Sequence, residues 1–259
     1  MKLGIYYYKD TNKENADLII KEIIKHDLVI DNDNPDIVFC VGGDGTFLRA
    51  IHHYLNRLDK TIFVGINHGT LGFLYDFNKD DLSSLLEDIK NNNYGVKEYS
   101  LLRGDIKYLN KQETIYAVNE IRIENPFHTL ISDVFINDEL LETFRGNGLV
   151  VASSLGSSAY NKSLGGSLID HDIETLQLTE IAPIANNVYR TLGSSLVLSK
   201  EKEITFSGSF HHVVVGYDYL NIENKELASI KISSSDKKVK ILYNKNHSFI
   251  KRIRKSFIV

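Results

Sequence analysis

The chain has 259 residues, of which 42% are hydrophobic and 25% are charged, as in an ordinary folded protein. Its 34 acidic and 30 basic residues leave a net charge of −4, so no overall positive field attracts nucleic acid or an anionic membrane. No apolar stretch approaches the roughly 20 residues that a membrane span needs, and we expect a soluble, cytoplasmic protein without membrane or nucleic-acid partners. The single cysteine, Cys40, lies in an apolar run, which indicates inert packing and a reducing compartment.

The first part of the chain alternates strand and helix patterns. The predicted strands are Leu3–Tyr8, Asp36–Val41 and Thr61–Ile66, and the predicted helices are Asn12–His26, Phe47–Leu58 and Asp80–Asn91. Strands that alternate with helices over short loops indicate a parallel sheet, which binds ligands at the carboxyl ends of its strands. We therefore expect an α/β N-terminal domain with a parallel, Rossmann-like sheet over residues 1–95.

Short strands dominate after the turn-like segment Asn91–Gly95. The predicted strands are Leu101–Leu109, Thr114–Glu124, Leu130–Ile136, Leu149–Ala152, Ser195–Ser207, His212–Ile222 and Ile230–Tyr243. Turn residues such as Asn137–Asp138 indicate hairpins, so residues 96–245 predict a mainly antiparallel, β-rich C-terminal domain. Within the C-terminal segment, residues 246–259, the stretch Ser248–Phe257 predicts a short helix with one apolar face. We interpret its basic run Lys251–Lys255 as a solvated face rather than a nucleic-acid site.

The segment Gly42-Gly43-Asp44-Gly45-Thr46 follows a predicted strand and precedes a predicted helix. Glycines at such a turn let backbone N–H groups approach an anion, and a helix N-terminus favours negative charge, so the turn predicts an oligophosphate site. Asp44 is itself an anion, so phosphate binding is not its purpose. Its carboxylate could accept a proton from a hydroxyl that attacks a phosphoryl group, help to hold Mg²⁺, or merely cap the following helix.

Three other segments stand out. Gly65–Leu74 holds three glycines, which indicates either a tight loop approached by another backbone or a ligand, or a simple strand-to-helix connection. Asn119-Glu120 interrupts an apolar strand, on which neighbouring side chains point to opposite faces. Ser153–Gly166 is rich in small residues and hydroxyls, and Tyr160 within it could stack on a planar ring. The histidine pairs of the chain lack the spacing of metal ligands, and we expect no metal site made by the protein.

Taken together, these segments resemble the NAD kinase family. GGDGTFLRA, GINHGTLGFL, NE, FRGNGL, SSAYNKSLGG and LTEIAP occur in the family's order and span most of the chain. Diacylglycerol and sphingosine kinases share the GGDGT loop but not the combination of Asn119-Glu120 with SSAYNKSLGG. The resemblance implies transfer of the terminal phosphoryl group of ATP to the 2′-hydroxyl of the adenosine ribose of NAD, with Mg²⁺ or another divalent cation. It leaves polyphosphate open as a donor, and implies a homo-oligomer, a dimer or homotetramer.

The resemblance also implies roles for particular residues. Asp44 matches the base that activates the ribose 2′-hydroxyl. The turn that would hold the donor's phosphates matches Gly42, Gly43, Gly45 and Thr46. The residues that match the family's contacts to the dinucleotide are Gly45, Asn119, Glu120, Arg145, Asn147, Ser158, Ala159, Tyr160, Ser163 and Ala182. The terminal segment of family members packs on the first domain, and we expect the same of residues 246–259.

Two departures from the family pattern bear on function. Asn147 stands where the family commonly has Asp. A ligand contact that needs the negative charge of Asp is lost, whereas one in which the side chain accepts a hydrogen bond from a carboxamide can be kept by the Asn oxygen. Ser154–Tyr160 lacks the proline of the family's T-P-x-G-S/T-T-A-Y segment. Two alternatives remain at this point: a dinucleotide-binding regulator without catalysis, and a lipid or small-metabolite kinase that shares the GGDGT loop.

Overall fold

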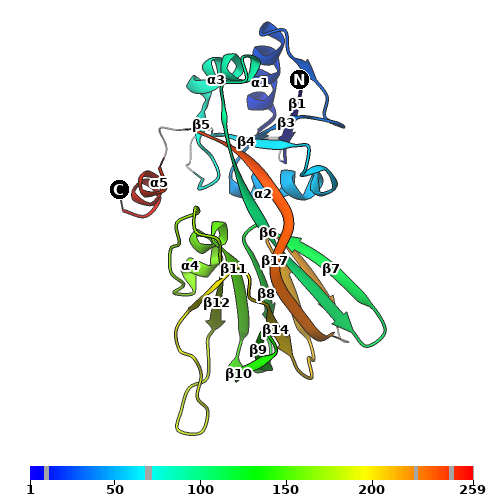
Figure 1. Ribbon diagram of the computed structural model, residues 1–259, viewed down its shortest axis with the longest axis vertical. Helices are drawn as coiled ribbons and strands as arrows, with labels where there is room; N and C mark the ends of the chain where they lie inside the picture. The colour runs from blue at the N-terminus through cyan, green and yellow to red at the C-terminus, as the bar shows by residue number, and fades with distance from the viewer. Residues whose placement is uncertain (9–11, 68–71, 225–226, 245–247, 259) are drawn as a thin grey trace. The chain divides into compact units, whose positions relative to one another are not determined.

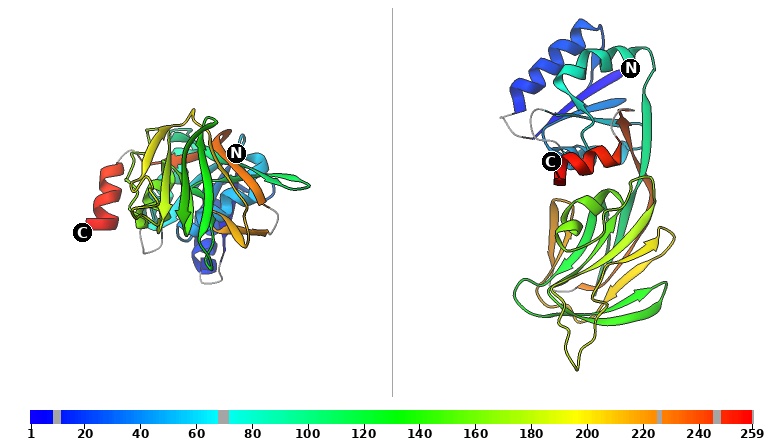
Figure 2. Two further views of the ribbon diagram at one scale, coloured as in Figure 1. Left: turned by 90° about the horizontal axis from the view of Figure 1, so that it is seen from below. Right: turned by 90° about the vertical axis from the view of Figure 1, so that its left-hand side faces the viewer.

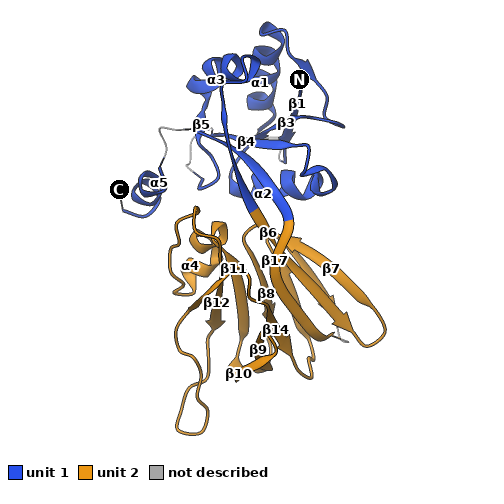
Figure 3. Ribbon diagram, in the orientation of Figure 1, with its two compact units in different colours: residues 1–99, 237–259 blue, residues 100–236 orange. Residues whose placement is uncertain are grey.

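The structure, a computed structural model, describes residues 1–8, 12–67, 72–224, 227–244 and 248–258 (Figure 1). It comprises two compact units, one of residues 1–99 with 237–259 and one of residues 100–236 (Figure 3). The strands β6 (Gly95–Tyr108) and β17 (Leu227–Tyr243) each run from one unit into the other. Lys237–Tyr243 thus belongs to the first unit, whereas the sequence placed residues up to 245 in the second domain.

A parallel sheet forms the centre of the first unit. Its strands pair in the order β2-β1-β3-β4, and the end of β17 extends it by pairing with β4. Their bounds are β1 (Lys2–Tyr7), β2 (Val29–Ile30), β3 (Ile37–Val41), β4 (Ile62–Asn67) and β5 (Phe77–Asn78), which pairs with β4. Every residue of β3 is buried, as expected for a strand covered on both faces.

Helices cover both faces of this sheet. Helices α1 (Lys13–Lys25) and α3 (Leu82–Lys90) lie side by side on one face and bury their apolar residues against β1, β3 and β4 (Figure 2). Helix α2 (Asp44–His53) packs on the other face, where the ring of Phe47 contacts that of Phe63 at a centroid distance of 6.2 Å. A short 3₁₀ turn, Leu55–Arg57, follows α2, and another, Lys79–Asp81, precedes α3. The expected α/β fold of the N-terminal part is confirmed.

The second unit consists of two antiparallel layers. One layer pairs β10 (Glu139–Gly146), β9 (Leu130–Ile136), β14 (Ile204–Ser207) and β17, with β6 and β7 (Gln112–Ala117) beyond them. The other layer has the order β13-β12-β11-β8-β15-β16. Its strands are β8 (Glu120–Glu124), β11 (Gly148–Ser153), β12 (Thr175–Ile181), β13 (Leu196–Ser199), β15 (Val213–Tyr217) and β16 (Leu220–Asn224).

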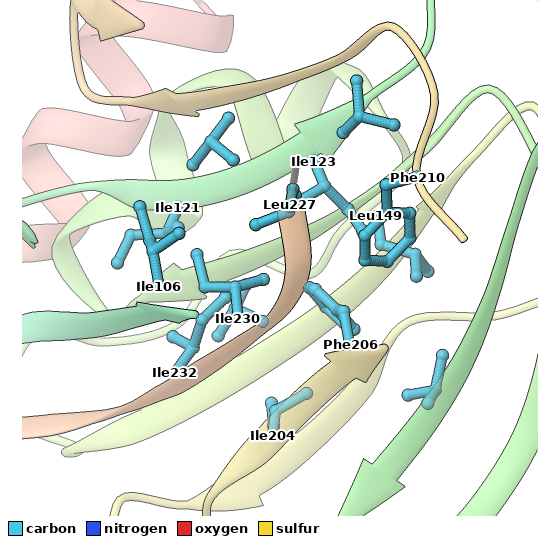
Figure 4. Packing of buried hydrophobic residues seen from close by; sticks show 14 of the residues in the cluster. Ile106, Ile121, Ile123, Leu149, Ile204, Phe206, Phe210, Leu227, Ile230 and Ile232 are labelled. Atoms are coloured by element: carbon cyan, nitrogen blue, oxygen red, sulfur yellow. The ribbon is translucent and has the colours of Figure 1, made fainter. Parts of the chain in front are cut away.

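Alternate residues of the two layers form one apolar core (Figure 4). Ile121 and Ile123 of β8 point into it, together with Ile230 and Ile232 of β17. Because side chains alternate along a strand, the neighbouring residues of β8 point to the opposite, outer face of their layer. A 3₁₀ turn (Leu155–Ser158) and the short helix α4 (Tyr160–Ser163) follow β11. The predicted antiparallel, β-rich C-terminal part is confirmed.

Several strand predictions for the second unit are wrong in detail. Thr114–Glu124 divides into β7 and β8, Ser195–Ser207 into β13 and β14 of different layers, and His212–Ile222 into the hairpin β15–β16. Strands β10 and β12 were missed: a bulge between Leu140 and Glu142 breaks the alternation of β10, and most of β12 is buried on both faces. The hairpin turn at Asn137–Asp138 is confirmed, with φ of +49° and +67°.

The C-terminal segment forms α5 (Phe249–Ile253) and a π-helical turn (Arg254–Ile258). Ser248 caps α5 by accepting a hydrogen bond from the Lys251 N–H at 3.3 Å. Among the described residues, no helix is long and apolar enough to cross a membrane.

Candidate active site

The GGDGT turn joins the carboxyl end of β3 directly to α2, whose N-cap is Gly43. Gly42 has φ of +154°, and a Cβ there would lie 2.4 Å from Oγ1 of Thr46, so the turn requires glycine at this position. A Cβ at Gly43 or Gly45 would meet nothing within 4 Å. Both glycines are exposed, so the backbone of the turn is open to an approaching ligand.

Asp44 does not cap α2, so that interpretation of the residue is wrong. Its carboxylate instead accepts hydrogen bonds from the backbone N–H of Phe73 at 2.9 Å and of Leu74 at 3.1 Å. Burial raises the pKa of Asp44, while these two hydrogen bonds and the charge of Arg252 oppose the rise. The carboxylate is therefore fixed in orientation and more basic than an exposed aspartate, as a general base requires.

The glycine-rich segment after β4 approaches the GGDGT turn closely. A Cβ at Gly72 would lie 2.3 Å from Oδ1 of Asp44, so only glycine leaves room for the carboxylate. The Tyr75 hydroxyl donates to the Gly43 carbonyl at 2.9 Å. Residues 68–71 of the predicted loop lie outside the described residues. The described part shows the close approach that the glycines predicted.

Asn119 and Glu120 lie where the chain leaves β7 and enters β8. The Asp218 carboxylate accepts hydrogen bonds from the N–H of Val118 at 2.9 and 3.1 Å and of Asn119 at 2.7 Å, which fixes this break in the strand. A Cβ at Gly156 would lie 2.0 Å from the Asn119 carbonyl oxygen, so the turn after β11 packs directly on this backbone. Within the described chain, the Asn119 carboxamide makes no hydrogen bond and remains available to a ligand.

Glu120 is a buried carboxyl group with spare capacity for hydrogen bonds. It is 4% exposed, and its Oε2 has no hydrogen-bond partner among the described residues. Burial and the neighbouring carboxylate of Asp218 raise the pKa of Glu120 to about 8. At neutral pH the group is therefore largely protonated, and it can donate one hydrogen bond to a ligand hydroxyl as well as accept one.

Arg122, which the sequence interpretation missed, connects this carboxyl group to Tyr160. Its guanidinium donates to Glu124 Oε2 at 2.8 Å and to Glu120 Oε1 at 3.3 Å. The Tyr160 hydroxyl donates to Glu124 Oε1 at 3.2 Å, and the Arg122 guanidinium lies 5.5 Å from the centre of the Tyr160 ring. Charged residues at every second position of an apolar strand were the available signal, because they share one face.

The segment after β11 carries four of the predicted site residues. Ser158 and Ala159 are partly buried, whereas Tyr160, at 38%, and Ser163 are exposed. The Ser158 hydroxyl donates to the Leu155 carbonyl at 3.3 Å, so it stabilises its own turn. Tyr160 thus presents an accessible ring whose hydroxyl is fixed by Glu124.

Arg145, Asn147 and Ala182 lie close together at the ends of neighbouring strands. The Asn147 N–H donates to the Ile181 carbonyl at 2.9 Å, and the Arg145 carbonyl accepts from the Ile184 N–H at 2.7 Å. The Asn147 side-chain amide donates to the Asn125 carbonyl at 3.4 Å, a bond that an aspartate could not make. Ala182 is exposed with φ of +44°, an uncommon conformation for a residue other than glycine.

Within the first unit the structure thus groups the GGDGT turn with the segment Gly72–Asp76. Within the second unit it groups Glu120 with Arg122, Glu124 and Tyr160, and Arg145 with Asn147 and Ala182. Thr46 is 8% exposed, and its N–H donates to the Gly43 carbonyl at 2.7 Å. Its hydroxyl is therefore the group that would make the predicted contact with phosphate. The roles of these residues toward a ligand remain predictions.

The raised pKa of Glu120 predicts a pH dependence of stability. Between about pH 5 and pH 8 the folded chain holds a proton that the unfolded chain releases, so the free energy of unfolding falls as pH rises, by about 1.4 kcal/mol per pH unit. Glu120→Gln removes this titratable group, so the variant should gain stability relative to the parent as pH rises across the same range. Urea unfolding at several pH values measures the difference, and parallel curves for the two proteins would contradict the prediction.

Comparisons with known proteins agree on one family. Residues 8–94 match the ATP-NAD kinase N-terminal domain, and residues 118–243 match the ATP-NAD kinase C-terminal domain. The chain is 35% identical to the NAD kinase of Leuconostoc citreum over 100% of this chain and 98% of that protein. It is 41% identical to the NAD kinase of Geobacillus stearothermophilus over 91% of this chain and 88% of that protein.

Two solved structures share the fold. The crystal structure of a yeast NADH kinase in complex with NADH has a TM-score of 0.84 at 19% identity, covering 98% of this chain and 86% of that one. An NAD kinase from Archaeoglobus fulgidus in complex with ATP has a TM-score of 0.80 at 20% identity, covering 98% and 99%.

Proposed function

Because the chain belongs to the NAD kinase family, we propose that it transfers the terminal phosphoryl group of ATP to the 2′-hydroxyl of the adenosine ribose of NAD, which gives NADP. The observation that carries this proposal is the Asp44 carboxylate, which two backbone N–H groups orient at the start of α2 inside an open glycine turn. The carboxylate can take the proton of an acceptor hydroxyl, and the backbone N–H groups of the turn can bind the phosphates of a donor.

Asp44 acts as the general base in this proposal. It takes the proton of the 2′-hydroxyl while that oxygen forms a bond to the terminal phosphorus of ATP and the bond to the leaving ADP breaks. The Asp44 proton is then released to solvent. Each carboxylate oxygen accepts one backbone hydrogen bond and keeps further lone-pair capacity for the substrate hydroxyl. The burial that raises its pKa makes it a better base near neutral pH.

The glycine turn is proposed to hold the phosphates of the donor. Gly43 and Gly45 are exposed and leave open space beside the N-terminus of α2, where backbone N–H groups and the helix dipole favour negative charge. The Mg²⁺ or other divalent cation enters with ATP as part of that substrate and offsets charge on the transferring group. Inorganic polyphosphate would present the same chemistry to the turn.

The second unit is proposed to bind the dinucleotide. The Asn119 carboxamide can hydrogen-bond a ribose hydroxyl, and so can Oε2 of Glu120, which has no partner in the described part of the chain. Tyr160 offers a ring for stacking. Arg145 and Asn147 would contact the nicotinamide side, and Ala182 would make a further contact with the dinucleotide, as the family resemblance implies. Ser158, Ala159 and Ser163 would line the dinucleotide site beside Tyr160. Arg122 donates a hydrogen bond to Glu120, and Asp218 accepts one from the Asn119 N–H, so the position of both residues is fixed, which supports their assignment.

Tyr160→Ala is expected to raise the KM for NAD about tenfold, because a lost stacking contact is worth about 1.4 kcal/mol, and to change kcat less. Tyr160→Phe is the matched control, since it keeps the ring and loses only the hydrogen bond to Glu124. Initial-rate kinetics at saturating ATP measure both. A KM that is the same for the alanine variant as for the parent would exclude the ring from the site.

Location and assembly are proposed on the family resemblance. We expect a cytoplasmic protein that forms a homo-oligomer, a dimer or tetramer. Exposed apolar side chains on β9 and β10, among them Ile131 and Leu140 at 50% and 55%, support contact between copies. Sedimentation equilibrium tests the assembly, and a monomer at all concentrations would exclude it.

The experiment that tests the reaction is NADP formation from NAD, ATP and Mg²⁺, detected with an NADP-specific dehydrogenase. Polyphosphate and NADH serve as alternative donor and acceptor. Turnover with NAD and ATP supports the proposal. Measurable NAD binding without turnover by any donor would instead indicate a regulator, and the absence of both would point to the lipid-kinase relatives of the GGDGT loop.

A further inference from the structure

The residues that orient Asp44 belong to a short buried segment, Phe73–Asp76, which we name the clasp. All four of its residues are at most 9% exposed. The first two donate their backbone N–H groups to the Asp44 carboxylate. The third, Tyr75, donates its hydroxyl to the Gly43 carbonyl at 2.9 Å. The clasp therefore holds both the proposed base and the turn that carries it.

The fourth clasp residue, Asp76, binds the C-terminal helix. Arg252 of α5 donates from Nε to Asp76 Oδ1 at 3.0 Å and from Nη2 to both carboxylate oxygens at 2.7 Å. The side chains are 15% and 5% exposed, so the pair is largely removed from water. A fork of this kind fixes direction as well as distance, which a lysine at the same position could not do.

A second contact joins the same two segments. The ring of Phe257, in the π-helical turn after α5, lies 5.2 Å from the ring of Phe73. The Asn244 N–H, at the end of β17, also donates to Asp76 at 3.2 Å. The C-terminal segment thus contacts the first and the last residue of the clasp, while the residues between them face Asp44 and Gly43.

We propose that Arg252 is a positioning residue for phosphoryl transfer, which fixes the clasp through Asp76 and thereby sets the orientation of the Asp44 carboxylate. Phe257 acts with it by packing on Phe73. This revises the interpretation of Lys251–Lys255 as a uniformly solvated face, since Arg252 points into the unit. Arg252 touches no reacting atom in this proposal. It orients Asp44 through the clasp, whereas its charge also lowers the pKa of Asp44, and Arg252→Lys, which keeps a positive charge, separates the two effects. The inference rests on the proposed role of Asp44.

The test compares three single variants and, where needed, one double variant with the parent. Arg252→Gln removes the charge and the fork, and Arg252→Lys keeps the charge and removes the fork. Arg254→Gln, on the exposed side of the same segment, is the matched control. The double variant Arg252→Gln, Asp76→Asn leaves no unpaired buried charge and serves if Arg252→Gln does not fold. Two quantities are measured: the kinetic constants for NAD, and amide hydrogen exchange at Phe73 and Leu74.

Arg252→Gln and Arg252→Lys should each lower kcat by about tenfold or more, and raise the KM for NAD less, because small displacements of a reacting group are costly. Exchange at Phe73 and Leu74 should accelerate while exchange in β3 stays unchanged, and Arg254→Gln should match the parent in both. Unchanged exchange at the two amides, or an equal acceleration throughout the unit, overturns the inference. If the parent shows no turnover, the proposed function fails, while the exchange measurement still decides whether Arg252 fixes the clasp.

Discussion

Asp44→Asn should lower kcat for NADP formation by at least about 10²-fold, because an amide cannot accept the proton of the attacking hydroxyl. The substitution keeps the size of the side chain, so NAD binding should persist. Its NH₂ group, however, would face one of the two N–H donors of Phe73 and Leu74, and one of these hydrogen bonds is lost. The clasp should therefore loosen locally in this variant, and this effect must be separated from the loss of the base.

The pH dependence of kcat in the parent separates the loss of the base from the loosening of the clasp. Because burial raises the pKa of Asp44, the acid limb of kcat should lie above the pH at which an exposed aspartate titrates. The variant should lose this limb together with its activity. Asp17→Asn, on the exposed side of α1, is the matched control and should leave kcat unchanged. Near-normal turnover in Asp44→Asn, with NAD binding intact by titration calorimetry, would reject the assignment of the base.

The local part of this site could be predicted from the sequence. A strand pattern, a glycine turn and a helix pattern are short-range signals, and they placed the GGDGT turn at the carboxyl end of β3 as the structure has it. The turn at Asn137–Asp138 was equally predictable, because few residues tolerate positive φ at two successive positions. Such features depend only on neighbours in the chain.

The partners of the site residues could not be predicted, because they come from distant parts of the chain. The amides that hold Asp44 lie 29 and 30 residues away, and the Asp218 carboxylate that fixes Asn119 lies 99 residues away. Asn119-Glu120 interrupts the apolar pattern of Thr114–Glu124, but the pattern resumes at once with Ile121 and Ile123, so the sequence predicted one strand and not the break that Asp218 stabilises. Strand β17 likewise joins the parallel sheet only because β4 offers it an open edge.

Arg252 shows the same limit most clearly. Its sequence neighbours are basic, and a basic run at helical spacing indicates a solvated face. The buried carboxylate of Asp76, 176 residues earlier in the chain, changes that interpretation for one residue and leaves it intact for Arg254, which is exposed. A charged residue is usually exposed, so the sequence predicts exposure for each residue of a basic run. The exception is a residue that pairs with a buried opposite charge, and the sequence does not show that partner.

Gly72→Ala should lower kcat by about 10²-fold, because its Cβ would lie 2.3 Å from Oδ1 of Asp44 and must displace the carboxylate. The backbone of Gly72 does not have positive φ, so the effect would come from crowding of Asp44 rather than from backbone strain. A displaced carboxylate strains or loses its hydrogen bonds to the N–H groups of Phe73 and Leu74, which hold it in the orientation proposed for the substrate hydroxyl. The measurement is kcat for NADP formation, with the unfolding free energy determined in parallel.

Gly4→Ala provides the matched control, because its Cβ would lie 2.9 Å from the Pro35 side chain and crowds the same unit far from the clasp in sequence. Both variants should lose some stability through crowding, whereas only Gly72→Ala should lose kcat selectively. A similar loss of kcat in the two variants would show that general destabilisation, rather than the position of the carboxylate, determines the rate. A selective loss would mean that the glycine at position 72 is required by the orientation of the base, since Oδ1 and Cγ of Asp44 are the two atoms nearest to its Cβ.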